Sequence, residues 1–330
     1  MTTTVPDLNP SQPRKLLLAA STGGHIAQLA RLAPGLGARE DSLWVSFDSP
    51  QTRSLLSGRR TFMVPYIRPR DWRSTLHAFA QMREAVADEG FDAAVSTGAA
   101  LALAALPAAR LKGIPSLYIE SISRVDGPSM SGKALHAMRI FEMRCQHPSW
   151  ATGRWTPHPS VLDTFAPAAK EPAPTQPLKI FVTLGTIKGY RFDALIDAVL
   201  ATGLAGDNTT WQLGETRRND LPGRSTDQMT ADDFATAARE ADVVVTHAGV
   251  GTILNLLEMG IYPVAVVRRK SRGEHVDDHQ AQIAGLMQRA DIGHAGEADE
   301  ITAETLLTAS GLRVVSPMNR DSADAGWAPR

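Results

Sequence analysis

Cysteine is almost absent from this chain. Cys145 is the only one, so the sequence excludes an internal disulfide, a CxxC pair and a cysteine-based zinc site. A single thiol fits a reducing cytoplasm. An excess of charge is also missing, because 34 Lys and Arg stand against 35 Asp and Glu and leave a formal net charge of -1. That balance argues against nucleic acid as the main partner.

Long hydrophobic runs are missing as well. The longest uncharged, apolar-leaning run spans residues 93–109 and is interrupted by serine, threonine, glycine and proline, so it is too short and too polar to span a bilayer. Residues 1–15 are polar, contain three prolines and lack the apolar stretch of a signal peptide. We therefore expect a cytoplasmic protein, and any membrane contact would be peripheral, at the inner face of the cell membrane.

The chain is long enough for two domains. It has 330 residues, of which 43% are apolar and 21% charged, as in ordinary globular proteins. At about 150 residues per domain this length predicts two. Residues 166–177 hold four prolines and no periodicity, which is typical of a linker. We expect a flexible leader at 1–14, an N-terminal domain at 15–165, and a C-terminal domain at 178–330 whose last residues could return to the N-terminal domain.

Short apolar runs alternate with amphipathic segments in both halves, which predicts the α/β class with parallel sheets wound on both faces, in two Rossmann-like domains. Ligands of such sheets bind at the carboxyl ends of strands, so the glycine turns found there should line one cleft. In the N-terminal half we expect strands at 15–20, 43–47, 61–67 (at an edge, because of Pro65) and 116–121, helices at 26–36, 74–90 and 132–144, and a strand, turn and helix across 91–115. In the C-terminal half we expect strands at 179–186, 241–251 and 262–267 and helices at 192–200, 252–260 and 279–290.

The first glycine turn is Ser21-Thr22-Gly23-Gly24-His25. Two glycines permit a sharp turn and a close approach of a ligand. His25 falls at a helix start, where the partial positive charge disfavours imidazolium, so the ring should be neutral and able to accept a proton. From the pattern alone, a plain strand–helix turn with an exposed histidine stays open.

The second turn is HAGVGT at residues 247–252. A glycine turn that opens a helix presents backbone N–H groups to an anion, and diphosphate is the expected ligand. Leu254 stands where a dinucleotide fingerprint needs its last glycine, and no Walker A GK[ST] is present, which disfavours an NAD-dependent oxidoreductase. Gly185 and Thr186 form a third turn, whose hydroxyl suits a phosphate or a sugar. A purely structural turn stays open at both places.

Residues 268–280 are dense in charge. Arg268 opens a cationic run, and Glu274 is one of several groups able to pair with sugar hydroxyls. His275 and His279 have metal-like i,i+4 spacing, but the surrounding glycine and acidic residues predict a loop, and no third ligand is spaced for a metal. We expect this loop to fold over a polyhydroxylated ligand; a solvated charged loop is the alternative.

Taken together, these motifs resemble glycosyltransferase family 28. VTLGT and THAGVGTILNLLEMGIYPVAVVRRKSRGEHVDDHQAQIA resemble the family's C-terminal domain. STGGHIAQL and YIESISRVDGPSMSGKAL resemble the partner subunit of the eukaryotic two-subunit transferase that adds N-acetylglucosamine to dolichol-diphosphate sugar. The chain thus resembles both subunits fused over about residues 15–310. Some bacterial exopolysaccharide glycosyltransferases pair similar halves, and a peptidoglycan transferase is a bacterial relative.

The resemblance implies a GT-B fold, with two Rossmann-like domains facing across a cleft. It implies a UDP-sugar donor, used as a co-substrate without any cofactor, and an acceptor held mainly by the N-terminal domain. Asn255 stands where relatives carry an acid for the ribose, so it can accept one hydrogen bond but brings no charge. The expected donor-binding residues are Gly185, Thr186, His247, Gly249, Val250, Gly251, Thr252, Asn255, Arg268, Glu274, His279 and Gln280. The expected acceptor-binding residues are Thr22, Gly23, Gly24, Thr97, Gly98 and Arg124.

The expected reaction is direct displacement at the anomeric carbon of an α-linked UDP-sugar, with inversion. His25 matches the family's proposed general base. Glu120, an acidic residue, is the second candidate and would either orient His25 or replace it. The helix near Thr252 would stabilise the leaving UDP. No DxD motif is present, so we expect no metal.

Several alternatives stay open. The donor sugar is N-acetylglucosamine, glucose or glucuronate. The acceptor is a lipid-linked or other glycan, by resemblance only. Residues 124–144 mix apolar and basic side chains and suit an anionic membrane surface, or else a core helix with a basic rim. A UDP-N-acetylglucosamine 2-epimerase and a non-catalytic sugar-nucleotide-binding protein are the rival functions.

Overall fold

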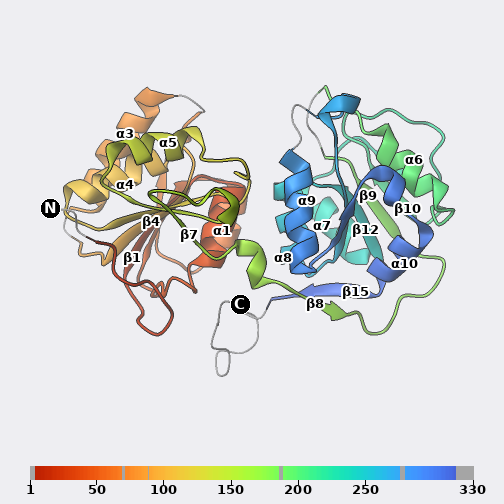
Figure 1. The fold of residues 1–330 in the computed structure, drawn as a ribbon, viewed down its shortest axis with the longest axis horizontal. Coiled ribbons are helices and arrows are strands. Elements are labelled where there is room, and N and C mark those ends of the chain that lie inside the picture. Colours follow the sequence, from red (N-terminus) through yellow and green to blue (C-terminus); the bar gives the residue numbers. More distant parts are fainter. Residues whose placement is uncertain (1–3, 69–70, 88, 186–188, 276–278, 317–330) are drawn as a thin grey trace. The chain divides into compact units, whose positions relative to one another are not determined.

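The computed structural model describes residues 4–68, 71–87, 89–185, 189–275 and 279–316 (Figure 1). Its contacts divide the chain into two compact units, with the boundary between Val161 and Leu162. Each unit contains a parallel sheet with helices, so the predicted α/β class is confirmed. The predicted return of the last residues to the N-terminal domain falls on 317–330, outside the described ranges.

Unit 1 is built on a seven-stranded sheet of order β3-β2-β1-β4-β5-β6-β7, in which neighbouring strands are parallel. The central strands are continuous apolar runs because a parallel sheet is covered on both faces; every residue of the first strand is buried. The strands are β1 (Leu16–Ala20), β2 (Leu43–Phe47), β3 (Thr61–Val64), β4 (Ala93–Gly98), β5 (Ser116–Glu120), β6 (Glu142–Cys145) and β7 (Trp155–Pro157). As predicted, β3 lies at an edge and ends before Pro65.

The helices of unit 1 are α1 (Gly24–Leu32), α2 (Pro50–Leu55), α3 (Trp72–Ala85), α4 (Ala102–Leu111) and α5 (Met130–Met138). Side chains of α3, α4 and α5 share one hydrophobic cluster with the sheet, and α4 packs against the other two. The buried Ile26 and Leu29 of α1 lie outside that cluster. The helices α3 to α5 therefore form one layer on one face of the sheet.

The predicted helix at 132–144 is wrong in its second half. The helix α5 ends at Met138, and Arg139 adopts a left-handed conformation with φ 57°. The chain then forms β6 beside β5. The physical reason is that burial alternates with the period of a strand in this stretch, with the buried side chains at Phe141, Met143 and Cys145.

Unit 2 contains a six-stranded parallel sheet of order β11-β10-β9-β12-β13-β14 and a separate antiparallel pair, β15-β8. The strands are β8 (Ala166–Ala169), β9 (Ile180–Thr183), β10 (Thr209–Gln212), β11 (Arg224–Thr226), β12 (Val243–His247), β13 (Pro263–Val266), β14 (His294–Gly296) and β15 (Leu312–Val315). The helices are α6 (Asp193–Ala201), α7 (Ala231–Glu240), α8 (Val250–Glu258), α9 (His279–Ala290) and α10 (Ala303–Ser310).

Part of the predicted linker at 166–177 is a strand. In β8 the residues 166–169 pair with β15, near the end of the described chain. The strand contains Pro167, which has no N–H to donate, and a two-stranded ribbon tolerates this because both strands are edges. Pairing with a distant segment is a tertiary interaction that local composition does not reveal.

The predicted glycine turns lie where strand order reverses. In unit 1 the chain order changes direction between β1 and β4, and in unit 2 between β9 and β12. Ligands of doubly wound sheets bind at the carboxyl ends of strands at such switch points. Residues 21–25 follow β1, Gly98 ends β4, Gly185 follows β9 closely, and His247 ends β12.

Among the described residues, no helix is both long and apolar enough to cross a membrane.

Candidate functional site

A pocket of about 600 Å³ opens at the switch point of unit 2. Five residues predicted to bind the donor line it together: Gly185, His247, Gly251, Thr252 and Asn255. They come from the end of β9, the end of β12 and the first turns of α8. The sequence therefore identified the parts of this pocket that follow β9, end β12 and begin α8.

Glycine is required at two positions because the His247 ring lies between them. A Cβ atom on Gly185 would stand 2.5 Å from Cε1 of His247, and Gly185 has a positive φ of 72°. A Cβ atom on Gly249 would collide with Nε2 of the same ring. By contrast, a Cβ atom on Gly251 would meet nothing within 4 Å. The imidazole thus packs directly against both glycine turns and fixes their spacing.

The His247 ring is neutral. Burial, followed by the charge of Arg268, lowers the pKa of His247 to about 3, although a hydrogen bond to the backbone of Thr183 opposes this. Because the carbonyl of Thr183 can only accept, one ring nitrogen must carry the proton and donate it. The other ring nitrogen then carries only a lone pair, so the neutral ring adds no buried charge beside the start of α8 and does not itself donate to an anion.

The first turn of α8 offers unpaired donors. The helix begins after Gly249, which has no side chain to cap it. Within the described ranges, no residue accepts a hydrogen bond from the backbone N–H of Val250, Gly251 or Thr252. Together with the helix dipole, these N–H groups favour an anion at the opening of the helix.

The sequence missed the remaining walls of the pocket. They come from the end of β10 and from the start of α7, and their residues are Gln212, Met229, Thr230, Ala231 and Phe234. The one local signal was the helix start at Thr230, whose hydroxyl oxygen accepts from the N–H of Asp233 at 3.1 Å. A second helix start therefore faces the pocket beside that of α8.

Arg268, which was predicted to bind the donor, is buried inside unit 2. Its side chain is 1% exposed and its guanidinium donates to the carbonyl oxygens of Leu184, Tyr190 (3.5 Å) and Glu274 (3.1 Å). It also lies 5.0 Å from the ring centre of Phe192. Burial lowers the pKa of Arg268 to about 10, and the nearby Glu274 opposes this. Arg268 therefore holds both ends of the segment that follows β9.

The neighbouring cations are paired within the protein. The carboxylate of Glu297 accepts from Arg269 at 2.7 Å and from Arg272 at 2.9 Å. Glu274 is buried and accepts from the backbone of Arg269 at 2.9 Å and from Arg272 at 3.0 Å. The segment around Glu274 is thus held by its own ion pairs, while residues 270–273 are exposed, so a solvated charged loop stays an alternative for them.

The other predicted donor-binding residues are placed only in part. Gln280 is buried, and its Oε1 accepts from the backbone of Arg268 at 3.3 Å. Thr186 lies outside the described residues. His279 is the first residue of α9. Among the described residues, no group of three or more His, Cys, Asp or Glu is arranged to hold a metal ion; the expected independence from a metal stays a prediction.

In unit 1 the His25 ring is held in one orientation. Its Nδ1 lies 2.7 Å from the carbonyl oxygen of Thr97, whose hydroxyl donates back to the carbonyl of His25 at 2.8 Å. Because a carbonyl only accepts, Nδ1 carries the proton, and the neutral ring has a lone pair on Nε2 to which no described residue donates. Burial lowers the pKa of His25, with a further contribution from Arg124. The expected neutrality agrees with this direction, but burial is the leading cause.

Gly98 leaves room for this ring. Its φ is 110°, and a Cβ atom there would approach Cε1 of His25 to 3.0 Å and the hydroxyl of Tyr118 to 3.3 Å. Gly23 also has a positive φ of 84° and precedes α1 directly. Of the predicted acceptor-binding residues, Thr97 and Gly98 therefore lie against the His25 ring, while their role toward an acceptor stays a prediction.

The sequence suggested that Glu120 orients His25. In the structure the carbonyl of Thr97 orients it instead. The carboxylate of Glu120 is fully buried and accepts from the Tyr118 hydroxyl at 2.9 Å and from the Ser121 N–H at 3.2 Å. It also accepts from the N–H and hydroxyl of Ser129, at 2.8 and 3.0 Å, where α5 begins. Burial raises the pKa of Glu120, and the donors around it oppose that rise. These contacts make Glu120 an anchor for the start of α5.

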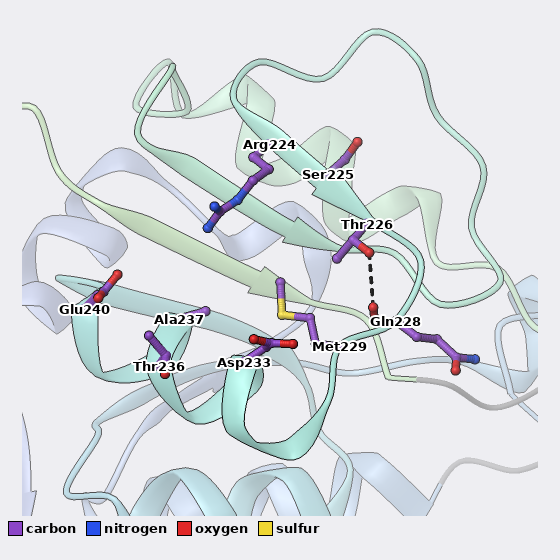
Figure 2. Close-up of a pocket in the computed structure, with 9 residues that line it drawn as sticks. All are labelled: Arg224, Ser225, Thr226, Gln228, Met229, Asp233, Thr236, Ala237 and Glu240. Carbon is purple, nitrogen blue, oxygen red and sulfur yellow. Dashed lines mark hydrogen bonds between the residues drawn. The ribbon is translucent and has the colours of Figure 1, made fainter.

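A second pocket in unit 2, of about 420 Å³, lies between β11 and α7 (Figure 2). Figure 2 shows Arg224, Ser225 and Thr226 on the strand side, and the side chains of α7 opposite them. It shares Met229 with the pocket at the switch point. None of the predicted site residues lines it.

Comparisons with known proteins agree with this geometry. Residues 194–310 match the model of the glycosyltransferase family 28 C-terminal domain. Over 71 residues the chain is 35% identical to the UDP-N-acetylglucosamine transferase subunit ALG13 of Yarrowia lipolytica, a stretch that is 21% of this chain and 34% of that protein. The chain thus matches about a third of this relative's length. The predicted resemblance to family 28 is confirmed.

Solved structures with the same fold cover nearly the whole chain. MurG of Acinetobacter baumannii is 17% identical with a TM-score of 0.51, over 89% of both chains. A putative UDP-N-acetylglucosamine 2-epimerase of Listeria monocytogenes is 11% identical with a TM-score of 0.51, over 90% of this chain and 94% of that one. A co-structure of S. aureus MnaA with UDP is 12% identical with a TM-score of 0.50, over 90% and 92%. They confirm the GT-B class of two Rossmann-like domains, while the expected cleft between these stays a prediction.

Proposed function

We propose that this chain is an inverting glycosyltransferase that moves a hexose-type sugar from a UDP-sugar to a glycan acceptor. One observation carries the proposal. Among the described residues nothing accepts from the backbone N–H groups of Gly251 and Thr252, and both residues line the pocket of about 600 Å³. This place lies inside the region that matches the glycosyltransferase family model. A diphosphate is the ligand whose charge suits unpaired backbone donors at a helix start.

The pocket suits the rest of the nucleotide as well. Asn255 stands one turn beyond Thr252 on α8 and lines the pocket, so its amide can hydrogen-bond a ribose hydroxyl. Gln212 and Phe234 line the same pocket and offer one polar and one flat apolar surface, as a base requires. N-acetylglucosamine, glucose and glucuronate remain equal candidates for the sugar.

His25 is our candidate for the general base. Its Nε2 lone pair is available because Thr97 fixes the tautomer through Nδ1. In the proposed reaction an acceptor hydroxyl attacks the anomeric carbon, its proton passes to Nε2, and the bond from that carbon to the UDP oxygen breaks. The negative charge that develops on UDP is stabilised by the N–H groups of α8. No metal and no cofactor takes part in this scheme.

The first test needs no acceptor. We expect isothermal calorimetry to detect UDP binding to the full chain, and we expect uridine to bind much more weakly because it lacks the diphosphate. An absence of heat with UDP would contradict the proposal.

A UDP-sugar screen against a membrane lipid extract, followed by mass spectrometry of the lipid fraction, then identifies donor and acceptor. Incubating each donor alone separates the rivals, since an epimerase forms the C2 epimer without an acceptor and a binding protein turns over nothing.

We also propose that unit 1 contacts an anionic membrane through α3 and α5, which fits a lipid-linked acceptor. Trp72 and Leu76 lie one turn apart on α3 and are 64% and 57% exposed, while Ala78 and Met82 face the core. Such aromatic and aliphatic side chains suit the headgroup boundary of a bilayer. The guanidinium of Arg73 lies 5.4 Å from the Trp72 ring and supplies positive charge.

The helix α5 presents a similar surface in the same layer. Met130, Met138 and Ile140 are exposed, and only Gly132 and Leu135 of the helix are buried. Leu135 and Phe141 of the predicted segment 124–144 belong to the core cluster, so a core helix with a basic rim stays the alternative. Our proposal adds the exposed face of α3 to that segment. The combined surface carries both the apolar area and the cations that anionic lipids attract.

Flotation with vesicles tests this surface. We expect the chain to float with vesicles that contain phosphatidylglycerol and to stay behind with neutral phosphatidylcholine vesicles. The double variant Trp72→Ser/Leu76→Ser should lose most of the binding. Leu307→Ser is the matched control, because Leu307 is exposed on α10 of unit 2. Equal flotation of both variants would count against the proposed surface.

A further inference from the structure

Two buried glutamines join separate segments of unit 1. Gln28 lies on α1, three residues after His25, and is 2% exposed. Gln146 directly follows β6 and is 1% exposed. Uncharged amides are rarely buried this deeply unless each polar atom has a partner, so their contacts show what they hold.

Gln28 connects α1 to the loop that follows β5. Its Nε2 donates to the hydroxyl of Ser121 at 3.0 Å, and its Oε1 accepts from the N–H of Ile122 at 3.0 Å. The same loop carries Arg124, whose N–H donates to the carbonyl of Ser121 at 2.9 Å. One side chain thus ties the helix of His25 to the loop of Arg124.

Gln146 extends this connection to the end of the unit. Its Nε2 donates to Oε1 of Gln28 at 3.2 Å and to the carbonyl of Glu120 at 3.0 Å. Its Oε1 accepts from the N–H of Val161 at 2.8 Å, and Val161 is the last residue before the unit boundary. Each side-chain nitrogen and oxygen of the two amides has at least one partner.

The start of α1 is therefore held at two successive turns. Thr97 fixes His25 through two hydrogen bonds, and Gln28 fixes the next turn of the helix. A ring held only by Thr97 could still shift with the helix, because Gly23 and Gly24 precede it without a side-chain cap. The glutamine pair removes that freedom.

We propose that Gln28 and Gln146 are positioning residues that set the place of the His25 ring relative to the loop of Arg124. The proposal rests on the proposed function, in which His25 takes the proton of the acceptor. Neither glutamine touches substrate; both act through α1 and the segments that it contacts.

The hydrogen-bond roles make the two positions unequal, although their volumes are the same. A glutamate at 28 keeps the acceptor for Ile122 and Gln146, and the hydroxyl of Ser121 can turn to donate to its second oxygen. A glutamate at 146 would place an oxygen against two acceptors, the Gln28 Oε1 and the Glu120 carbonyl. A role in packing alone would treat both exchanges alike.

Histidine NMR on the full-length chain tests the proposal without any donor sugar. With ¹³C-labelled histidine, the Cε1–H signal of His25 is identified by its loss in His25→Ala. We expect this signal to move in Gln28→Met and Gln146→Met, to return in Gln28→Glu, and to stay displaced in Gln146→Glu. Turnover should fall by about ten- to a hundredfold wherever the signal is displaced, with no change in UDP affinity.

Ser116→Ala is the matched control. Ser116 is 2% exposed, and its hydroxyl donates to the carbonyl of Ile114 at 3.1 Å at the start of β5, away from the carboxyl end of the sheet. Its loss should leave the His25 signal in place. An unmoved signal in both methionine variants, or an equal rescue by glutamate at both positions, would overturn the proposal. If the unmodified chain transfers no sugar from any donor, the proposed function fails instead, and the NMR comparison keeps the two failures apart.

Discussion

Replacing His25 with alanine is expected to lower turnover by about a hundredfold, the usual contribution of a general base, and to leave UDP affinity unchanged. The reason is that the ring lies in unit 1, whereas every residue lining the proposed UDP pocket lies in unit 2. Steady-state kinetics with the donor found in the screen, together with calorimetry of UDP, would measure both quantities. A variant of near-normal rate removes His25 from the mechanism.

The variant His25→Asn distinguishes loss of the base from loss of the hydrogen bond that holds the turn. Its side-chain N–H can still donate to the carbonyl of Thr97, as Nδ1 of His25 does at 2.7 Å, but it has no basic nitrogen to replace Nε2. If His25 only held the turn together, the asparagine would restore the rate. We expect it to be as slow as the alanine variant.

The pH profile provides a second readout of the same residue. A base is active when unprotonated, so the rate falls as the pH drops through its pKa. Burial, opposed by the hydrogen bond to Thr97 and assisted by the charge of Arg124, lowers the pKa of His25 below the ordinary histidine value of about 6.5. The acidic limb should therefore lie below that value in the natural chain and disappear from the slow residual activity of His25→Ala.

Most of the fold could be predicted because parallel strands covered on both faces are continuous apolar runs. The stretch LLLAA of β1 and the three valines that begin β12 are such runs, and each strand leads into a glycine turn. The errors occur where burial is one-sided or pairing is distant. The strand β6 has alternating burial and follows directly on a helix, and β8 is defined only by its partner β15.

The candidate site could be predicted only where backbone conformation dictates the residue. Gly185, Gly249 and Gly98 are constrained by the close approach of an imidazole ring, so glycine marks each turn. No comparable backbone constraint identifies residues such as Gln212 and Phe234 in the sequence, because many side chains could form that wall. The burial of Arg268 could not be predicted either, since a cation in a charged run gives no sign that three carbonyl oxygens will enclose it; its contact with the donor stays a prediction.

A pair of glycine substitutions should separate the shape of the turn from the room that it leaves for the ligand. In Gly249→Ala the new methyl group collides with His247, so we expect a loss of about 1–3 kcal/mol in the free energy of unfolding and a fall in Tm of several degrees. Because the start of α8 is displaced, UDP affinity should fall more than tenfold, the equivalent of about one charged hydrogen bond. Thermal denaturation and calorimetry would measure the two effects.

Gly251→Ala should behave differently, and this contrast carries the argument for the diphosphate. A Cβ atom at Gly251 meets nothing within 4 Å, and alanine is the better helix former, so stability should be unchanged or higher. If a diphosphate lies against the N–H groups of α8, the same methyl group occupies its place, and UDP affinity falls about tenfold or more while that of uridine does not change. Gly206→Ala is the control, because Gly206 also has open space around it but does not line the pocket. Full UDP affinity in a well-folded Gly251→Ala chain would place the diphosphate elsewhere and would remove α8 from the stabilisation of the leaving group.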